Sequence, residues 1–254
     1  THEKLNLQDK HGAARSLHKL FPEHSDKILF WECKGCSILS ILFIFKTIFF
    51  KLSSSVLVTG FGPFGNHEVN VSWEIAKLLP SLNLNDYGID IIIEEIPVAY
   101  SEVDEKVPSL WKKHKPRLVV HMGLTGTGTG IYFETVAHKM GYVKKDIYEK
   151  LPEDNSAKGR LDIHRTLLNV ELVAETLVNS VFNEIPIHVS SNAGRFLCEY
   201  IFYTSLNIDH TRTIFIHVPN TDKGFSVKQM ALVIREIILL LIKQIHINTE
   251  VKMP

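Results

Sequence analysis

The sequence is poor in cysteine and has no excess charge of either sign. Three cysteines, Cys33, Cys36 and Cys198, occur among 254 residues. So few cysteines exclude a disulfide framework and fit a reducing compartment. Lys and Arg together number 28, as do Asp and Glu, so the formal net charge is zero. This balance indicates neither a nucleic-acid partner nor binding to an acidic membrane surface.

The sequence also lacks an apolar run long enough for a clear membrane span. Residues 38–50 (ILSILFIFKTIFF) are strongly apolar, but a spanning helix needs about 20 apolar residues, and this run carries Lys46. A cleaved signal would place its apolar region nearer the amino terminus. We treat residues 1–54 as an extension of unknown role: a membrane-associating segment, an extra helix or a wrongly assigned exon. Cys33 and Cys36 form a lone Cys-x-x-Cys, which does not predict a zinc site.

From residue 55 onward, short β-branched runs alternate with segments of helical spacing. The expected strands are 55–59, 89–98, 116–122, 131–138, 185–189 and 213–218, and the expected helices are 72–79, 101–113, 169–182, 193–206 and 227–245. The charged, turn-rich segment 143–160 is typical of a surface loop. This alternation indicates one layered α/β domain over residues 55–247 with a largely parallel sheet, followed by a tail at 248–254.

A glycine turn, Gly60-Phe-Gly-Pro-Phe-Gly65, follows the first expected strand and matches Gly-x-Gly-x-x-Gly. A dinucleotide-binding loop opens a helix at once, because the phosphates sit at the helix amino terminus. Here the turn continues to Asn70, and the acidic residue expected about 20 positions later is missing. We therefore interpret Phe61 and Phe64 either as the apolar wall of a small-ligand pocket or as aromatics that plug the end of the sheet.

Cys198 lies in Ser-Asn-Ala-Gly-Arg-Phe-Leu-Cys198, at an expected junction of strand, turn and helix. A helix amino terminus favours a thiolate through its dipole and its free N–H groups. The same N–H groups suit a developing oxyanion. The alternative is an inert buried cysteine, which is the commoner state of free cysteine.

His217 ends an apolar strand, and ligand chemistry in open α/β sheets gathers at the carboxyl ends of strands. His121, His138 and His188 are rival candidates, and position alone does not choose among the four. Glu134 lies within an expected strand, where its carboxylate could orient a histidine and stabilise its cation. The alternative is a solvent-facing carboxylate on a half-exposed strand.

Taken together, these segments resemble the pyroglutamyl-peptidase I family. The resemblance runs in order from about Val56 to about Leu241 and rests on Thr59–Gly65, Val69–Trp73, Glu134, Ser191–Cys198 and Phe215–Pro219. It is the combination of the Ala-Gly-x-x-x-Cys junction with the strand-terminal histidine that makes it specific. The resemblance implies a single α/β/α sandwich with a mostly parallel twisted sheet, no metal or other cofactor, and a cytosolic location.

The resemblance also implies a cysteine peptidase that hydrolyses the amide bond after an N-terminal pyroglutamyl residue of small peptides. Cys198 would be the nucleophile, with His217 first accepting its proton and later protonating the leaving amine. Glu134 would orient His217. Phe61 and Phe64 would hold the pyroglutamyl ring.

Asn70 and Leu124 complete the expected substrate-binding set. The chain departs from the family pattern at Leu124, where bacterial members carry glutamine, and at Val71, where proline is frequent. Three alternatives stay open: an impaired member that only binds pyroglutamyl-like ends, a different cysteine amidase, and a membrane-peripheral enzyme anchored through residues 38–50. We expect neither a nucleic-acid partner nor membrane association, and the sequence leaves the oligomeric state open.

Overall fold

The structure is a computed structural model that describes residues 54–65, 68–126, 128–180 and 184–250. The expectations for the extension 1–54, except at Ser54, lie outside these residues, and so does the end of the tail, 251–254. Both Cys33 and Cys36 are therefore outside the described part. Among the described residues, no helix is long and apolar enough to cross a membrane.

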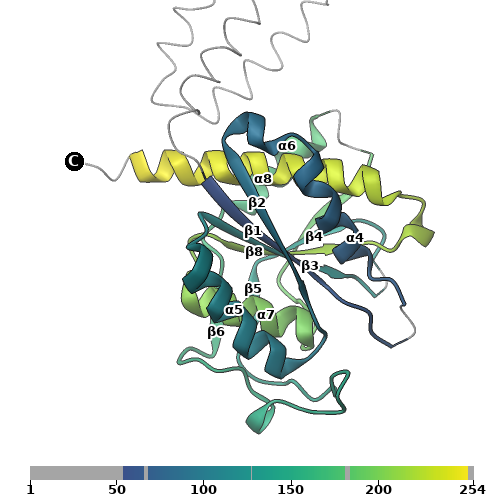
Figure 1. The fold of residues 1–254 in the computed structure, drawn as a ribbon, viewed down its shortest axis with the longest axis vertical. Helices are drawn as coiled ribbons and strands as arrows, with labels where there is room; N and C mark the ends of the chain where they lie inside the picture. Colours follow the sequence, from purple (N-terminus) through teal and green to yellow (C-terminus); the bar gives the residue numbers. More distant parts are fainter. Residues whose placement is uncertain (1–53, 66–67, 127, 181–183, 251–254) are drawn as a thin grey trace, which may run out of the picture. The chain divides into compact units, whose positions relative to one another are not determined.

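A six-stranded sheet forms the middle layer of the domain (Figure 1). Across the sheet the strands are β2 (Ile89–Ile96), β1 (Ser54–Phe61), β3 (Leu118–Leu124), β8 (Thr213–Val218), β4 (Ile131–Glu134) and β7 (Ile187–Ser190). Strand β4 runs antiparallel to β8, and the other neighbouring pairs are parallel. The expected, mostly parallel sheet is confirmed.

Helices cover both faces of this sheet, which gives the expected three layers (Figure 1). One face packs against α4 (Val71–Leu78), α6 (Val170–Val178) and α8 (Val227–Glu250), and the other against α5 (Tyr100–His114) and α7 (Leu197–Ile208). A small second sheet pairs β5 (Val136–His138) with β6 (Ile163–Arg165). Short 3-10 helices occupy Leu79–Ser81, Leu84–Tyr87, Glu153–Asn155 and Thr221–Lys223.

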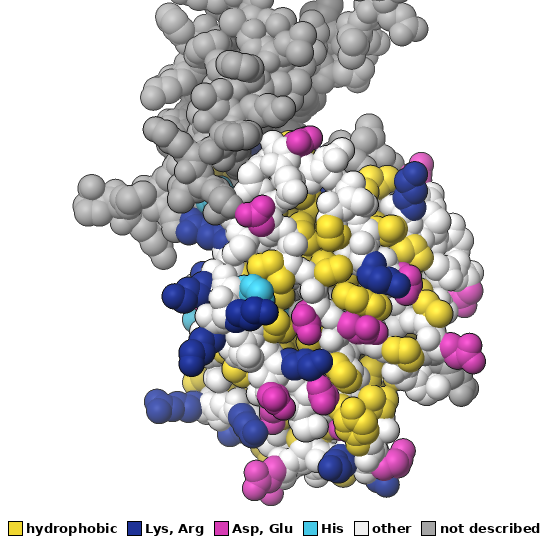
Figure 2. All heavy atoms as spheres, in the orientation of Figure 1, with side chains coloured by type: hydrophobic (Ala, Val, Ile, Leu, Met, Phe, Trp, Pro, Cys, Tyr) yellow, Lys and Arg dark blue, Asp and Glu magenta, His cyan; other side chains and the backbone are white. Residues whose placement is uncertain are grey.

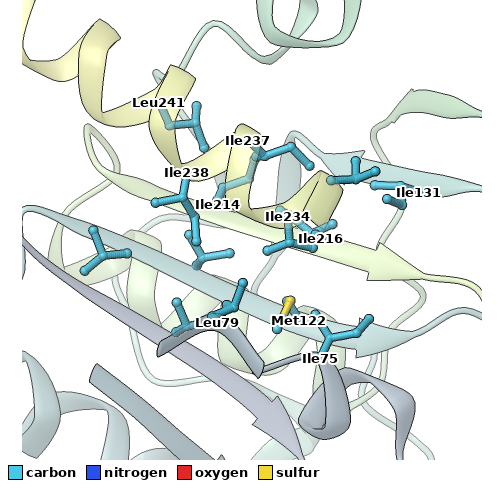
Figure 3. Packing of buried hydrophobic residues seen from close by; sticks show 14 of the residues in the cluster. Ile75, Leu79, Met122, Ile131, Ile214, Ile216, Ile234, Ile237, Ile238 and Leu241 are labelled. Carbon is cyan, nitrogen blue, oxygen red and sulfur yellow. The ribbon is translucent and has the colours of Figure 1, made fainter. Parts of the chain in front are cut away.

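Two apolar clusters, one on each face, hold the layers together. Figure 3 shows the cluster under α8, where Ile234 and Ile238 pack toward Ile214 and Ile216 of β8. Complete burial of one such side chain stabilises a fold by about 1.5–3 kcal/mol. At the surface, Figure 2 shows cationic and anionic side chains interspersed across the visible face, in keeping with the balanced composition.

Two expected elements differ in ways that shape the site. The expected strand 131–138 is split at Thr135 into β4 and β5, which belong to different sheets. The helix expected from residue 193 begins only at Leu197. Gly194 and Arg195 have φ values of +96° and +54°, which a right-handed helix cannot contain. Cys198 is therefore the second residue of α7 and not an interior one.

Candidate active site

The register of the central strands places one row of residues on the α5/α7 face of the sheet. Gly123 of β3 pairs with His217 of β8, and Tyr132 of β4 pairs with His217 from the other side. Thr59 of β1 pairs with His121, so Phe61 is level with Gly123, two residues further along both strands. Because side chains alternate between faces, this register brings the ends of several strands to one site.

The carboxylate of Glu134 holds the ring of His217. His217 Nδ1 lies 2.8 Å from Glu134 Oε1, and the two side chains are only 12% and 3% exposed. Glu134 Oε2 is buried and has no hydrogen-bond partner among the described residues. Phe215 packs against the histidine ring, with ring centroids 4.8 Å apart. Because Nδ1 is held by the carboxylate, Nε2 is the nitrogen left for proton transfer.

The sulfur of Cys198 lies over Gly123. A Cβ atom built on Gly123 would be 2.8 Å from Cys198 Sγ and 2.7 Å from Phe215 Cζ. A side chain at this position would therefore collide with both the thiol and the ring beneath it. The glycine is what allows Cys198 to approach the strand next to His217.

Burial and charge act in opposite directions on His217. Burial by itself lowers the pKa of the imidazole, but the negative charge of Cys198, its hydrogen bond with the histidine, and Glu134 raise that pKa to about 10. His217 is therefore favoured as an imidazolium beside Cys198. A histidine cation next to a cysteine is the arrangement that favours the nucleophilic thiolate in cysteine enzymes.

The amino terminus of α7 supplies backbone donors beside Cys198. The N-cap residue, Phe196, makes no side-chain capping bond, and the first N–H groups of a helix have no partner within it. Such N–H groups can stabilise an oxyanion that forms next to the sulfur. The late start of α7 is what puts Cys198 among them.

A buried carboxylate, Glu199, locks the turn before the nucleophile. It is fully buried and accepts the Arg195 main-chain N–H at 2.7 Å as well as bonds from the Arg195 guanidinium. The main-chain N–H and the Nδ1 atom of His138 bind the same carboxylate at 2.9 and 2.7 Å. Sequence reasoning missed this network. The available signal was an acidic residue directly after Cys198 with a basic residue one turn earlier.

Several aromatic side chains belong to the same apolar cluster as Cys198. Phe61 is 3% exposed and belongs to the same apolar cluster as the partly buried Phe64, Phe196 and Cys198. The structure therefore brings both expected phenylalanines to the side of the sheet that holds the nucleophile. Phe196 was not among the expected site residues, although it lies only two positions before Cys198.

The two other expected substrate-binding residues occupy different surroundings. Asn70 caps α4 through Ser72 and donates from Nδ2 to the Gly62 carbonyl at 3.0 Å. This second hydrogen bond connects the Asn70 side chain to the glycine turn. The side chain of Leu124 packs against the cluster under α8, because it alternates with Gly123 along β3. A ligand beside Cys198 would therefore meet the backbone of Leu124 and not its side chain, and substrate binding by Leu124 stays a prediction.

The rival histidines each have another partner. His121 is completely buried, and burial lowers its pKa to about 3, so this imidazole is neutral; its Nδ1 lies 2.7 Å from Thr59 Oγ1. His138 binds Glu199, and His188 stacks on Tyr132. Of the four histidines, only His217 combines a carboxylate partner with a hydrogen bond to Cys198.

The family model described as "Pyroglutamyl peptidase" matches residues 54–236. The chain belongs to the pyroglutamyl peptidase family. It is 37% identical to pyroglutamyl-peptidase 1 of Homo sapiens over 186 residues, which cover 72% of this chain and 88% of that protein. It is 34% identical to pyrrolidone-carboxylate peptidase of Thermococcus onnurineus, over 65% of this chain and 82% of the relative.

Solved structures of the pyroglutamyl peptidase family share the fold. A mutant pyrrolidone carboxyl peptidase of Pyrococcus furiosus aligns with a TM-score of 0.66 at 25% identity, over 75% of this chain and 99% of that one. Pyroglutamyl peptidase I of Bacillus amyloliquefaciens aligns with a TM-score of 0.65 at 26% identity, over 74% and 97% of the two chains. These alignments confirm the expected family and its α/β architecture.

Proposed function

We propose that this protein is a cysteine peptidase that removes an N-terminal pyroglutamyl residue from small peptides. The observation that supports it most is the 2.8 Å contact of His217 with Glu134 next to Cys198, whose sulfur lies over Gly123, the register partner of His217. Membership of the pyroglutamyl peptidase family supplies the substrate class.

In the proposed reaction, Cys198 Sγ attacks the carbonyl carbon of the pyroglutamyl residue, and the oxygen takes up negative charge beside the N–H groups at the start of α7. His217 then gives its proton to the leaving amine as the C–N bond breaks, which leaves a thioester. His217 next takes a proton from water as that water attacks the thioester. Pyroglutamate leaves, and the imidazolium–thiolate pair is restored.

The surroundings of Cys198 fit a lactam. A pyroglutamyl ring is small, uncharged and partly apolar, so aromatic walls and a few backbone hydrogen bonds suffice to bind it. Phe61, Phe64 and Phe196 are among the aromatic side chains that share an apolar cluster with the nucleophile. We propose that Phe61 and Phe64 hold the ring and that Asn70 positions their turn.

Three fluorogenic amides that differ only in the first residue test this assignment. The full chain under reducing conditions should release the fluorophore from pyroglutamyl amide but not from prolyl or glutaminyl amide, which lack the lactam. Equal cleavage of prolyl amide would instead indicate a different cysteine amidase. We further propose a cytosolic location, in keeping with the cysteine content; cell fractionation with detection of the intact chain tests it.

A further inference from the structure

The row of residues that holds the site continues past His217 to the edge of the sheet. Tyr132 is the cross-strand partner of His217, and His188 of β7 is the register partner of Tyr132. Their neighbours Ile131, Phe133 and Ile187 pack on the α8 face, so Tyr132 and His188 lie on the face of His217. Their rings are stacked, with centroids 4.8 Å apart and planes inclined by 29°.

The order of the row fixes the direction of a bound substrate. Phe61 lies on the β1 side of the sulfur, which sits over Gly123 of β3. His217 of β8, which must reach the leaving nitrogen, lies on the other side. With the pyroglutamyl ring toward Phe61, the next residue of the peptide therefore extends past β8 toward β4. Strands are about 4.8 Å apart and consecutive Cα atoms about 3.8 Å, so the Cα atom of that residue lies over β8, and a long side chain on it reaches toward Tyr132 of β4.

We propose that the stacked pair Tyr132–His188 is the subsite for the residue that follows pyroglutamate, and that it favours a flat aromatic or imidazole side chain there. Tyr132 is half-buried and Gly128 lies close to its ring, since an added Cβ there would be 2.5 Å from Tyr132 Cε2. His188 is exposed. The pair thus offers a supported, accessible ring surface, and this inference rests on the proposed function.

The test compares kcat/KM for pyroglutamyl-phenylalanine amide, pyroglutamyl-histidine amide and pyroglutamyl-alanine amide in the full chain. We expect the two ring-bearing substrates to be preferred over alanine by about threefold to tenfold, the range typical of one ring contact. Tyr132→Leu and His188→Ala should each lower that preference ratio toward one. The exposed histidine on an edge strand can be replaced with little risk to folding, so it keeps the test valid if Tyr132→Leu is unstable.

Tyr87→Leu is the matched control. Tyr87 is 46% exposed and lies under the Arg235 guanidinium, 5.2 Å from its ring centroid, away from the row. Its replacement should leave the preference ratio at the wild-type value. If wild-type protein cleaves all three substrates but neither variant changes the ratio, the subsite is overturned while the proposed function stands. If no pyroglutamyl substrate is cleaved, both are overturned.

Discussion

Gly123 leaves the space that the sulfur of Cys198 occupies. The space that a side chain at 123 would need is occupied by the sulfur and by Phe215. Sequence reasoning identified Cys198 through its motif, but it could not assign this role to Gly123, because the contact joins residues 75 positions apart. By contrast, the alternation of side chains along a strand could have predicted that the Leu124 side chain lies on the opposite face of the sheet from Cys198.

Gly123→Ala should lower kcat/KM by roughly 100-fold, because displacement of a reacting atom by about 1 Å has effects of that size. Overpacking should cost about 1–3 kcal/mol in the free energy of unfolding. Peptidase kinetics and thermal unfolding measure both. Gly126→Ala is the control, since an added Cβ there meets nothing within 4 Å; similar losses in both variants would refute the steric argument.

The charge of Glu134 should be visible in the titration of His217. Glu134 is one of the groups that raise the pKa of His217 to about 10, so the imidazolium should persist through neutral pH and lose its proton only in alkaline solution. Glu134→Gln removes the negative charge, and the midpoint should therefore move to lower pH. NMR of labelled histidine measures the shift, and an unchanged midpoint would show that Glu134 does not act on His217.

At the scale of elements, the sequence predicted whether a segment is a helix or a strand better than it predicted where that element begins and ends. The strand 213–218 was predicted with its observed bounds. The start of α7 was misplaced, since Arg195 has a left-handed conformation and donates its N–H to Glu199. Glu199 is bound in turn by His138, which lies 61 positions away, and no local pattern reveals that contact. The split at Thr135 likewise follows from pairing: its N–H donates to the Ser190 carbonyl, whereas periodicity along the chain is continuous.

The start of helix α7 should depend on Glu199. Glu199→Gln removes the charge that binds Arg195 and His138, and breaking a buried pair of this kind costs about 3 kcal/mol. We expect kcat to fall more than KM rises, because the turn positions the nucleophile. Glu102→Gln is the matched control, another first-turn glutamate whose ion pair with Lys106 is partly exposed. Equal effects in the two variants would deny Glu199 a positioning role.

Asn70 both caps helix α4 and supports the glycine turn, and two substitutions separate these roles. Asn70→Ala loses both functions of the side chain and should cost about 1–2 kcal/mol of stability. Asn70→Ser retains a capping oxygen but lacks the amide that reaches the Gly62 carbonyl, so stability should fall less. KM for a pyroglutamyl amide should rise in both variants, as Phe61 and Phe64 lose their support. An unchanged KM in both would limit Asn70 to capping.

At the scale of the whole molecule, the sheet order brings distant segments to one line. Phe61, Gly123, His217 and Tyr132 come from four strands. Tyr132 and Glu134 lie two positions apart on β4 and therefore share the face of the histidine, because side chains alternate along a strand. Alternating patterns predicted the layers, and the family resemblance implied the triad. Neither predicted the row, because strand order and register arise from packing of the complete chain.

The most direct test of the account is hydrolysis of a fluorogenic pyroglutamyl amide by the full chain and by Cys198→Ala. We predict turnover under reducing conditions by the wild-type protein and its loss in the variant, with the thermal unfolding transition preserved. A folded wild-type protein without turnover would contradict the account. So would a Cys198→Ala variant that remains active.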